Sequence, residues 1–142
     1  MISVALRRTS GDYGFEIKDS LDHLLQTDAG KDTGGNDAGF RPMQLVLAAL
    51  GSCSAIDVVA IFKKQRQMLS DISIVVEGQR EADVIPSLWK NITIHFTLEG
   101  NIEDEKANRA VELSVEKYCS VAETLRRSGT EITWTVTNIK LG

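Results

Sequence analysis

The fold is decided by residues 41–66, which read RPMQLVLAALGSCSAIDVVAIFKKQR. Pro42 suits the first turn of a helix, where the backbone N–H that proline lacks would have no partner. At helical spacing the apolar residues between Met43 and Phe62 point to every side, which is typical of a buried or a membrane-spanning helix. The longest unbroken apolar run, Leu45 to Leu50, has only six residues, whereas a membrane span needs about 18. We therefore predict a buried central helix with Cys53 near its middle.

Length and composition limit which classes of protein are possible. The chain has 142 residues, a usual size for one domain, and we predict a single domain over residues 1–142. A formal net charge of −4 argues against nucleic acid and anionic membranes as partners. The N-terminal residues contain no basic segment followed by a long apolar run, so we expect no signal peptide and predict a cytoplasmic protein. In that compartment Cys53 and Cys119 are not expected to form a structural disulfide.

Three short strands are predicted before the central helix. Residues 2–8 and the segment from Tyr13 to Ile17 alternate apolar and polar side chains. The turn residues Ser10-Gly11-Asp12 between them indicate a hairpin. A third strand is predicted around residues 23–27. Residues 28–39 contain four glycines but no phosphate-binding glycine motif, so we expect a mobile surface loop there.

The rest of the chain predicts two clear strands, two helices and a closing strand, over residues 71–80, 90–99, 104–117, 120–127 and 132–139. Ser120 and Glu123 fit a capping box, which makes Ser120 the predicted N-cap of the second, short helix. That helix is expected to end at Gly129. The predicted order is βββ-α-ββ-α-α-β, an α+β domain with a mainly antiparallel sheet.

The central helix also predicts self-association. A helix that is apolar on all sides needs cover on all sides, and one sheet of about six strands covers only one of them. The two short C-terminal helices can shield part of the remainder. A second copy of the chain, packed helix against helix in a symmetric dimer, would shield the rest.

The two cysteines are the candidates for chemistry. Cys53 lies about three turns into its helix, so a reactive thiolate there needs a cation nearby, with Arg7, Arg8 and Arg41 as candidates. Cys119 lies at the start of the second short helix, where the helix dipole favours a thiolate. The alternative is that both cysteines are inert core residues, because free cysteine is often buried.

Two other kinds of site are less well supported. A zinc site needs three or four closely spaced ligands, and His23 and His95 are isolated from both cysteines. A cysteine–histidine nucleophile would need a histidine near Cys53, a role that stays open for His23. Asp57, four residues after Cys53, lies on the same helical face, where a carboxylate raises the pKa of a thiol.

Two segments carry a family resemblance. PMQLVLAALGSCSAIDVV (residues 42–59) and EKYCSVAETL (residues 116–125), with the strand order around them, resemble the OsmC-like family. That family includes osmotically inducible protein C and the organic hydroperoxide resistance proteins. The resemblance covers essentially the whole chain. It implies an intertwined homodimer in which two strand-rich sheets wrap a pair of central helices.

The resemblance also implies an activity, a thiol-dependent peroxidase of oxidative and osmotic stress defence. Cys53 corresponds to the peroxidatic cysteine, which attacks the O–O bond of an organic hydroperoxide and becomes a sulfenic acid. Cys119 corresponds to the resolving cysteine, which condenses with it to a disulfide. A small dithiol of the lipoyl type then reduces that disulfide. No metal or bound cofactor is implied.

The chain departs from the family pattern at the start of the central helix. Characterised peroxidases carry a glutamate just after the proline, paired with an essential arginine from the N-terminal strands. Here Met43 and Gln44 follow the proline, and Arg7 or Arg8 is the candidate arginine. A glutamine orients an arginine without neutralising it, so we predict slow peroxidase turnover. A dimeric small-molecule binding module and a redox sensor of the same fold are the alternatives.

Overall fold

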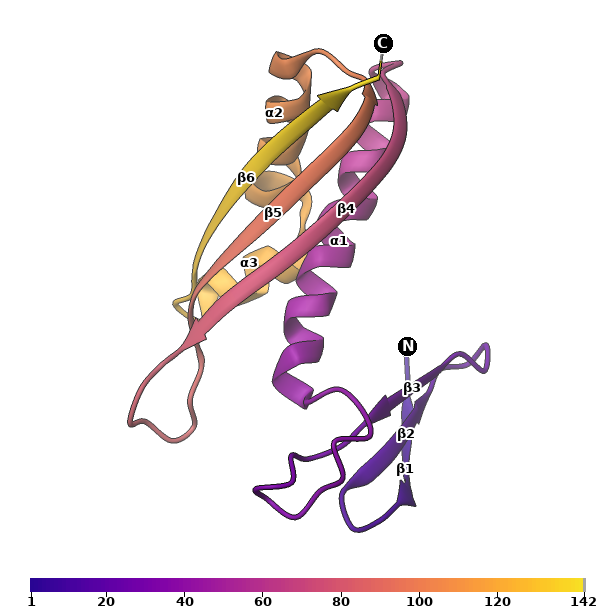
Figure 1. Cartoon of the computed structure of the whole chain (residues 1–142), viewed down its shortest axis with the longest axis vertical. Coiled ribbons are helices and arrows are strands. Elements are labelled where there is room, and N and C mark those ends of the chain that lie inside the picture. The colour runs from indigo at the N-terminus through magenta and orange to yellow at the C-terminus, as the bar shows by residue number, and fades with distance from the viewer. Residues whose placement is uncertain (142) are drawn as a thin grey trace. The chain divides into compact units, whose positions relative to one another are not determined.

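The structure, a computed structural model, describes residues 1–141, and their elements follow the predicted order with one π-helical segment added. The elements are β1 (Ala5–Ser10), β2 (Gly14–Lys18), β3 (Leu24–Thr27), α1 (Pro42–Lys64), β4 (Met68–Arg80), β5 (Trp89–Asn101), α2 (Asp104–Leu113), η1 (Ser114–Tyr118), α3 (Ser120–Arg127) and β6 (Glu131–Lys140) (Figure 1). Contacts divide the chain into two units, Met1–Val46 and Leu47–Gly142. The single domain over residues 1–142 stays a prediction.

The first unit contains an antiparallel sheet in the order β1-β2-β3. The predicted hairpin and the third strand are therefore confirmed. Strand β1 lies later in the chain than predicted, beginning at Ala5 rather than at residue 2. Ala5 pairs with Lys18, where β2 ends, so the residues before Ala5 have no partner strand. Gly11, at a φ of 58°, makes the turn into β2, a backbone conformation that glycine adopts at little cost.

The loop of residues 28–39 contains neither helix nor strand, as predicted, but it is not wholly a surface loop. Asp28 is only 2% exposed. Its carboxylate accepts the backbone N–H groups of Ala29, Asn36 and Ala38 at 2.8, 3.1 and 3.1 Å. A buried carboxylate with three donors is well satisfied, and it joins the two ends of the loop.

The second unit is built on a sheet in the order β4-β5-β6. The expectation of one sheet of about six strands is wrong, because the described strands form two separate three-stranded sheets. Strand β4 runs antiparallel to β5, whereas β6 runs parallel to it. A parallel neighbour needs a crossover connection, and the segment that contains α2, η1 and α3 supplies it. The remaining pairings are antiparallel, so the mainly antiparallel prediction is confirmed.

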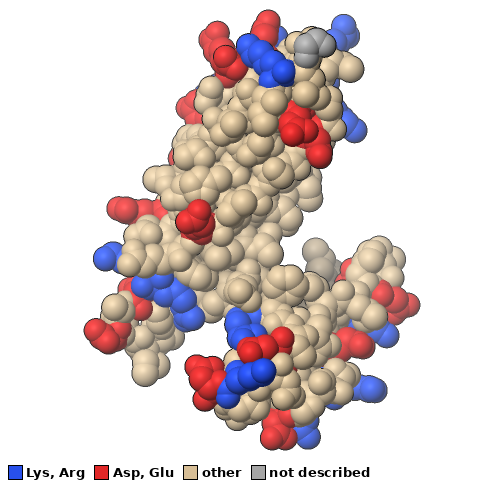
Figure 2. All heavy atoms as spheres, in the orientation of Figure 1, with Lys and Arg blue, Asp and Glu red and all other residues tan. Residues whose placement is uncertain are grey.

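One face of this sheet forms the core. In β5 the alternate side chains are at most 1% exposed, and they are Ile92, Ile94, Phe96 and Leu98. Helices α1, α2 and α3 contribute to the same buried cluster and lie on one side of the sheet (Figure 1). The other face carries hydroxyl pairs such as Thr93 with Thr133, at 2.9 Å. Figure 2 shows few charged side chains on that face.

Helix α1 is the predicted central helix, and it begins at Pro42 as expected. One row of its residues, four apart, is buried against the core, namely Leu50, Ser54, Val58 and Phe62. Gly51 lets the helix approach β4, since a Cβ there would lie 2.9 Å from a methyl group of Val76. The opposite side is open within one chain, and Ile56 is 69% exposed.

By length and composition α1 could also cross a membrane. This is weak evidence, because the core helix of a soluble protein meets the same criteria. The absence of a membrane partner stays a prediction, and so does the cytoplasmic location.

We expect the open side of α1 to be the surface through which two chains associate. Ile56→Lys should weaken the dimer about tenfold or more in Kd, because a lysine in an apolar interface loses its hydration. Val75→Lys is the matched control, because Val75 is 60% exposed on the opposite face of the sheet. Sedimentation at several concentrations measures the association. A wild-type protein that stays monomeric at micromolar concentration would contradict this prediction.

Candidate functional site

Three reactive side chains come together within the Leu47–Gly142 unit. The sulfurs of Cys53 and Cys119 and a carboxylate oxygen of Asp57 all lie within 4.8 Å of one another. Cys53 and Asp57 share one face of α1 because they are four residues apart. Cys119 reaches them from the junction of η1 and α3. Both thiols are free, Cys53 half-buried and Cys119 only 2% exposed.

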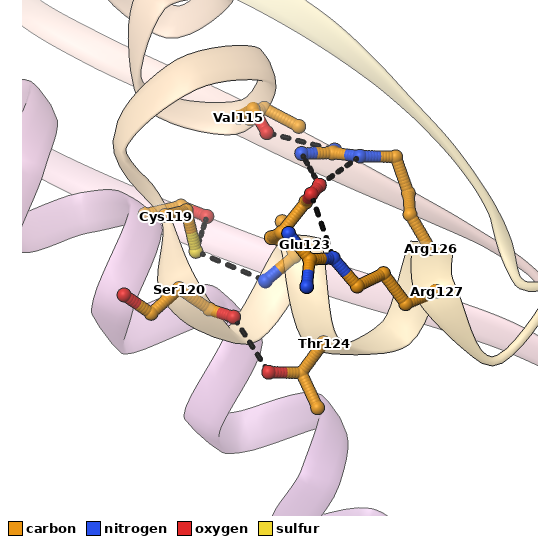
Figure 3. Close-up of polar contacts among 9 residues, drawn as sticks. Val115, Cys119, Ser120, Glu123, Thr124, Arg126 and Arg127 are labelled. Atoms are coloured by element: carbon orange, nitrogen blue, oxygen red, sulfur yellow. Dashed lines mark hydrogen bonds and ion pairs between the residues drawn. The ribbon is translucent and has the colours of Figure 1, made fainter.

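Cys119 itself is the N-cap of α3. Its sulfur accepts the backbone N–H of Ala122 at 3.4 Å (Figure 3). The predicted capping box is therefore wrong, because Ser120 is the first helical residue rather than the cap. The carboxylate of Glu123 instead pairs with Arg126 and Arg127 within the helix. The sulfur thus occupies the position where a hydroxyl or carboxylate oxygen usually caps a helix.

The segment before Cys119 differs from the predicted helix over residues 104–117. Helix α2 ends at Leu113, and η1 continues it as a π-helical turn. The N–H of Cys119 donates to the carbonyl of Ser114 at 2.7 Å, five residues back. Such widened turns are frequent at functional sites.

Two serines attach this turn to the central helix. The Ser114 hydroxyl donates to the carbonyl of Ser54 on α1 at 2.9 Å. The Ser54 hydroxyl in turn donates to the sulfur of Cys119 at 3.4 Å. Both serines are fully buried. Sequence reasoning missed them, although Ser54, beside Cys53 in a largely apolar helix, was a usable indication of a buried polar contact.

The environment of Cys53 disfavours its thiolate. Burial raises the pKa of this thiol most, and a hydrogen bond to Cys119 and the charges of Cys119 and Asp57 raise it further. The backbone N–H of Val121 acts in the opposite direction. Among the described residues no cation is a principal influence on this pKa. The predicted effect of Asp57 on the thiol is therefore confirmed in direction.

Asp57 is itself poorly solvated. Burial raises the pKa of its carboxyl group, and a hydrogen bond with Ser114 partly offsets that effect. The Oδ2 atom is buried and accepts no hydrogen bond from the described part of the chain. The residue also lines a cavity of about 480 Å³ together with apolar side chains such as Ile61 and Leu113.

The candidate arginines all lie in the Met1–Val46 unit. Arg7 and Arg8 are exposed neighbours on β1, so their side chains point to opposite faces of the strand. Arg7 pairs in register with Glu16, and Arg8 with Phe15. Which of the two serves a thiolate stays a prediction.

Arg41 and Gln44 make contacts with each other and with the loop before α1. The guanidinium of Arg41 forms an ion pair with Asp37 and donates to the carbonyl of Gly39 at 3.1 Å. The side-chain oxygen of Gln44 accepts the backbone N–H of Arg41 at 2.9 Å. This bond satisfies a donor at the start of α1, as the third residue of a capping box does. The action of Gln44 on a catalytic arginine stays a prediction.

The two histidines occupy separate places. His95 lies on the outer face of the sheet, where its ring contacts Thr135 at 2.8 Å and Glu77 at 3.3 Å. His23 contacts Asp19 at 2.7 Å in the Met1–Val46 unit. A role for His23 beside Cys53 stays open.

The raised pKa of Asp57 predicts the behaviour of Asp57→Asn. A carboxyl group whose pKa in the folded state lies above the ordinary value of 3.8 stabilises the fold fully at pH below 3.8. This contribution is lost as pH rises through the pKa of the folded state. At neutral pH the variant should therefore be the more stable, by on the order of 1 kcal/mol. The pKa of Cys53 should fall, because a charge that raises it is removed. Urea unfolding across pH and the ultraviolet absorbance of the thiolate measure both effects.

Glu116→Gln is the matched control for that variant, because Glu116 is an exposed carboxylate of η1. It should change neither the pH dependence of stability nor the titration of Cys53. An Asp57→Asn protein whose stability followed pH as the wild type does would show that the carboxylate is solvated in the folded state.

Comparison with known proteins identifies the family. The family model described as OsmC-like protein matches residues 34–135. Protein YhfA of Escherichia coli K12 is 42% identical over 98 residues, which cover 68% of this chain and 72% of that protein.

Solved structures share the fold. A hypothetical protein from Aquifex aeolicus VF5 is 33% identical, with a TM-score of 0.80 over 97% of each chain. An organic hydroperoxide resistance protein OsmC from Legionella pneumophila is 16% identical, with a TM-score of 0.74 over 96% of each chain, a likeness of fold alone. The predicted resemblance is confirmed, and the chain belongs to the OsmC-like protein family.

Proposed function

We propose that the chain is a thiol-dependent peroxidase that reduces organic hydroperoxides in oxidative and osmotic stress defence. One observation carries this proposal. The sulfurs of Cys53 and Cys119 are far apart in sequence yet lie within 4.8 Å of each other, with Cys53 half-buried and Cys119 buried. A half-buried thiol beside a buried one suits a peroxidatic and a resolving cysteine, because the first meets substrate and the second meets only the first.

Related proteins support the substrate class. Structures with this fold include organic hydroperoxide resistance proteins from Legionella pneumophila and Elizabethkingia anophelis. The cavity of about 480 Å³ next to Asp57 is lined by apolar side chains such as Ile61 and Leu113 as well as by Lys64 and Gln65, and its apolar part suits the organic group of such a hydroperoxide.

The reaction proceeds through the two sulfurs in turn. The Cys53 thiolate attacks one oxygen of the hydroperoxide, the O–O bond breaks, and the alkoxide that leaves takes up a proton to become an alcohol. Cys53 is then a sulfenic acid. The Cys119 sulfur attacks the Cys53 sulfur, a disulfide forms, and the sulfenic oxygen leaves as water. A small dithiol of the lipoyl type reduces the disulfide and is itself oxidised to a disulfide.

A cation is needed for the first step. Burial and the charge of Asp57 hold the pKa of Cys53 above its ordinary value, which leaves little thiolate at neutral pH. We assign the cation to Arg7 or Arg8, each exposed on β1. Such a charge would lower the thiol pKa and stabilise the developing alkoxide. In this proposal Gln44 takes the position of the family glutamate. We further propose that the enzyme is a homodimer and that it is cytoplasmic.

A redox sensor is the second candidate function. The raised pKa of Cys53 favours it, because a thiol that is seldom ionised reacts slowly with peroxide. A sensor is oxidised once and stays oxidised until a partner protein reduces it, whereas a peroxidase consumes many hydroperoxide molecules in succession. Continuous consumption of an organic hydroperoxide in the presence of a dithiol therefore separates the two.

The two cysteine variants should behave differently. Cys53→Ser should abolish hydroperoxide consumption, because no sulfur remains to attack the O–O bond. Cys119→Ser should react once and stop as a sulfenic acid, which excess peroxide oxidises further. Intact mass after one equivalent of hydroperoxide measures both, and wild type should lose two protons without gaining oxygen. Ser52→Ala, at an exposed position beside Cys53, should react as wild type does.

Full dithiol-driven turnover by Cys119→Ser would contradict the role of the resolving cysteine. Loss of activity in Ser52→Ala would show that disturbance of α1, rather than loss of the thiol, explains the effect of Cys53→Ser.

The two arginines of β1 provide their own control. Since their side chains point to opposite faces of the strand, only one should act on the thiolate. Replacing that arginine by alanine should raise the pKa of Cys53 and slow peroxide consumption by roughly 10²–10³-fold, and replacing its neighbour should change neither. Gln44→Glu should increase the rate, because a carboxylate fixes a guanidinium more firmly than an amide does. Thiolate titration and steady-state kinetics measure these effects. Equal, small changes in both alanine variants would show that neither Arg7 nor Arg8 acts on the thiolate.

A further inference from the structure

The cluster of Cys53, Asp57 and Cys119 also has the composition of a metal site. Two thiol sulfurs and one carboxylate oxygen lie within 4.8 Å of one another. Zinc bonds are about 2.3 Å to sulfur and about 2.0–2.2 Å to oxygen, so ligands around one ion lie roughly 3.3–3.8 Å apart. Closing the three groups onto one ion therefore shortens each separation by at most about 1.0–1.5 Å, which small rotations of the three side chains can provide.

An independent observation points to a cation at this place. The Oδ2 atom of Asp57 is buried and accepts no hydrogen bond from the described residues. Two other buried side-chain oxygens share that condition, but they belong to the amides Gln65 and Asn138. An unsatisfied carboxylate oxygen in such surroundings is costly, and a bound cation would satisfy it.

The surroundings of the two sulfurs fit the same interpretation. The backbone N–H of Val121 forms a hydrogen bond with Cys53, and the N–H of Ala122 donates to Cys119. These consecutive donors belong to the first turn of α3, and the Ser54 hydroxyl adds a third at 3.4 Å from Cys119. Donors of this kind orient metal-bound groups and offset the negative charge that two thiolates bring.

We propose that, in the reduced protein, Cys53, Asp57 and Cys119 bind one Zn²⁺ ion per chain, with a water molecule as the fourth ligand. Two sulfurs and one oxygen select a thiophilic ion over Mg²⁺ or Ca²⁺, which prefer oxygen ligands alone. Three protein ligands leave one position of a tetrahedral ion open. The sequence did not indicate this site, because Cys119 lies 66 positions after Cys53 and metal ligands are recognised in a sequence by close spacing.

The zinc site does not depend on the proposed peroxidase activity. Cys53 cannot, however, bind zinc and attack a peroxide at the same time. A sulfur bound to zinc has shared the electron pair with which it would attack a peroxide. The disulfide of Cys53 and Cys119 has no thiolate left to bind the metal. Metal binding is therefore measured directly on the reduced protein, without peroxide and without an activity assay.

Titration of the reduced full chain with Co²⁺ tests the proposal. Wild type should bind one Co²⁺ per chain, with a thiolate-to-cobalt charge-transfer band and visible bands of a tetrahedral ion, and Zn²⁺ should displace it. Cys53→Ser and Cys119→Ser should each lose tight binding. Asp57→Asn should keep the charge-transfer band but bind at least about tenfold more weakly. Glu116→Gln, at an exposed carboxylate, should bind as wild type does.

A second measurement needs no variant and so does not depend on any substitution folding correctly. Zn²⁺ should slow the alkylation of Cys53 in wild type, and a chelator should restore the rate. The proposal is overturned if reduced wild type shows no charge-transfer band, if Asp57→Asn binds Co²⁺ as tightly as wild type, or if Zn²⁺ leaves the alkylation rate unchanged.

Discussion

Packing of helix α1 against the buried face of strand β5 is the interaction on which the Leu47–Gly142 unit depends. The buried row of α1 has its residues four apart, from Leu50 to Phe62, and the apolar ones belong to the same core cluster as Phe96 of β5. Each large apolar side chain buried in this way contributes about 1.5–3 kcal/mol. Cys53 and Asp57 each precede a member of the buried row, so they lie at its edge. The rotation of α1 that buries its apolar row therefore also places the thiol and the carboxylate at the border of the core.

That position explains the chemical character of the site. At the border of the core the Cys53 thiol is partly desolvated, and burial is the largest influence that raises its pKa. The compensating groups come from the start of α3, where two consecutive N–H groups each reach one sulfur. A backbone donor is weaker than a full positive charge at stabilising a thiolate. The unit therefore brings both thiols together while leaving Cys53 mostly protonated, so a reactive thiolate at Cys53 would need a cation that this environment does not supply.

Much of the fold could be predicted from periodicity, because each strand and helix buries one side or one row. The errors arose where a partner distant in sequence decides the outcome. Strand β1 begins only where β2 can pair with it. At the start of α3 local preference favours Ser120 as the cap, but docking of η1 on α1 sets the register and gives that place to Cys119. The proximity of Cys53 and Asp57 followed from helical spacing, whereas the arrival of Cys119 beside them could be expected only from the family resemblance.

The parallel pairing of β5 and β6 has a consequence for the order of folding. Paired residues such as Thr93 and Thr133 are 40 positions apart, so β6 can dock only after the whole crossover has been synthesised. Contacts of such long range form late and slowly. Cys119 lies within this crossover, whereas Cys53 belongs to a helix made much earlier. An oxidant that reaches the nascent chain before residue 119 has been made therefore meets Cys53 without its neighbouring thiol.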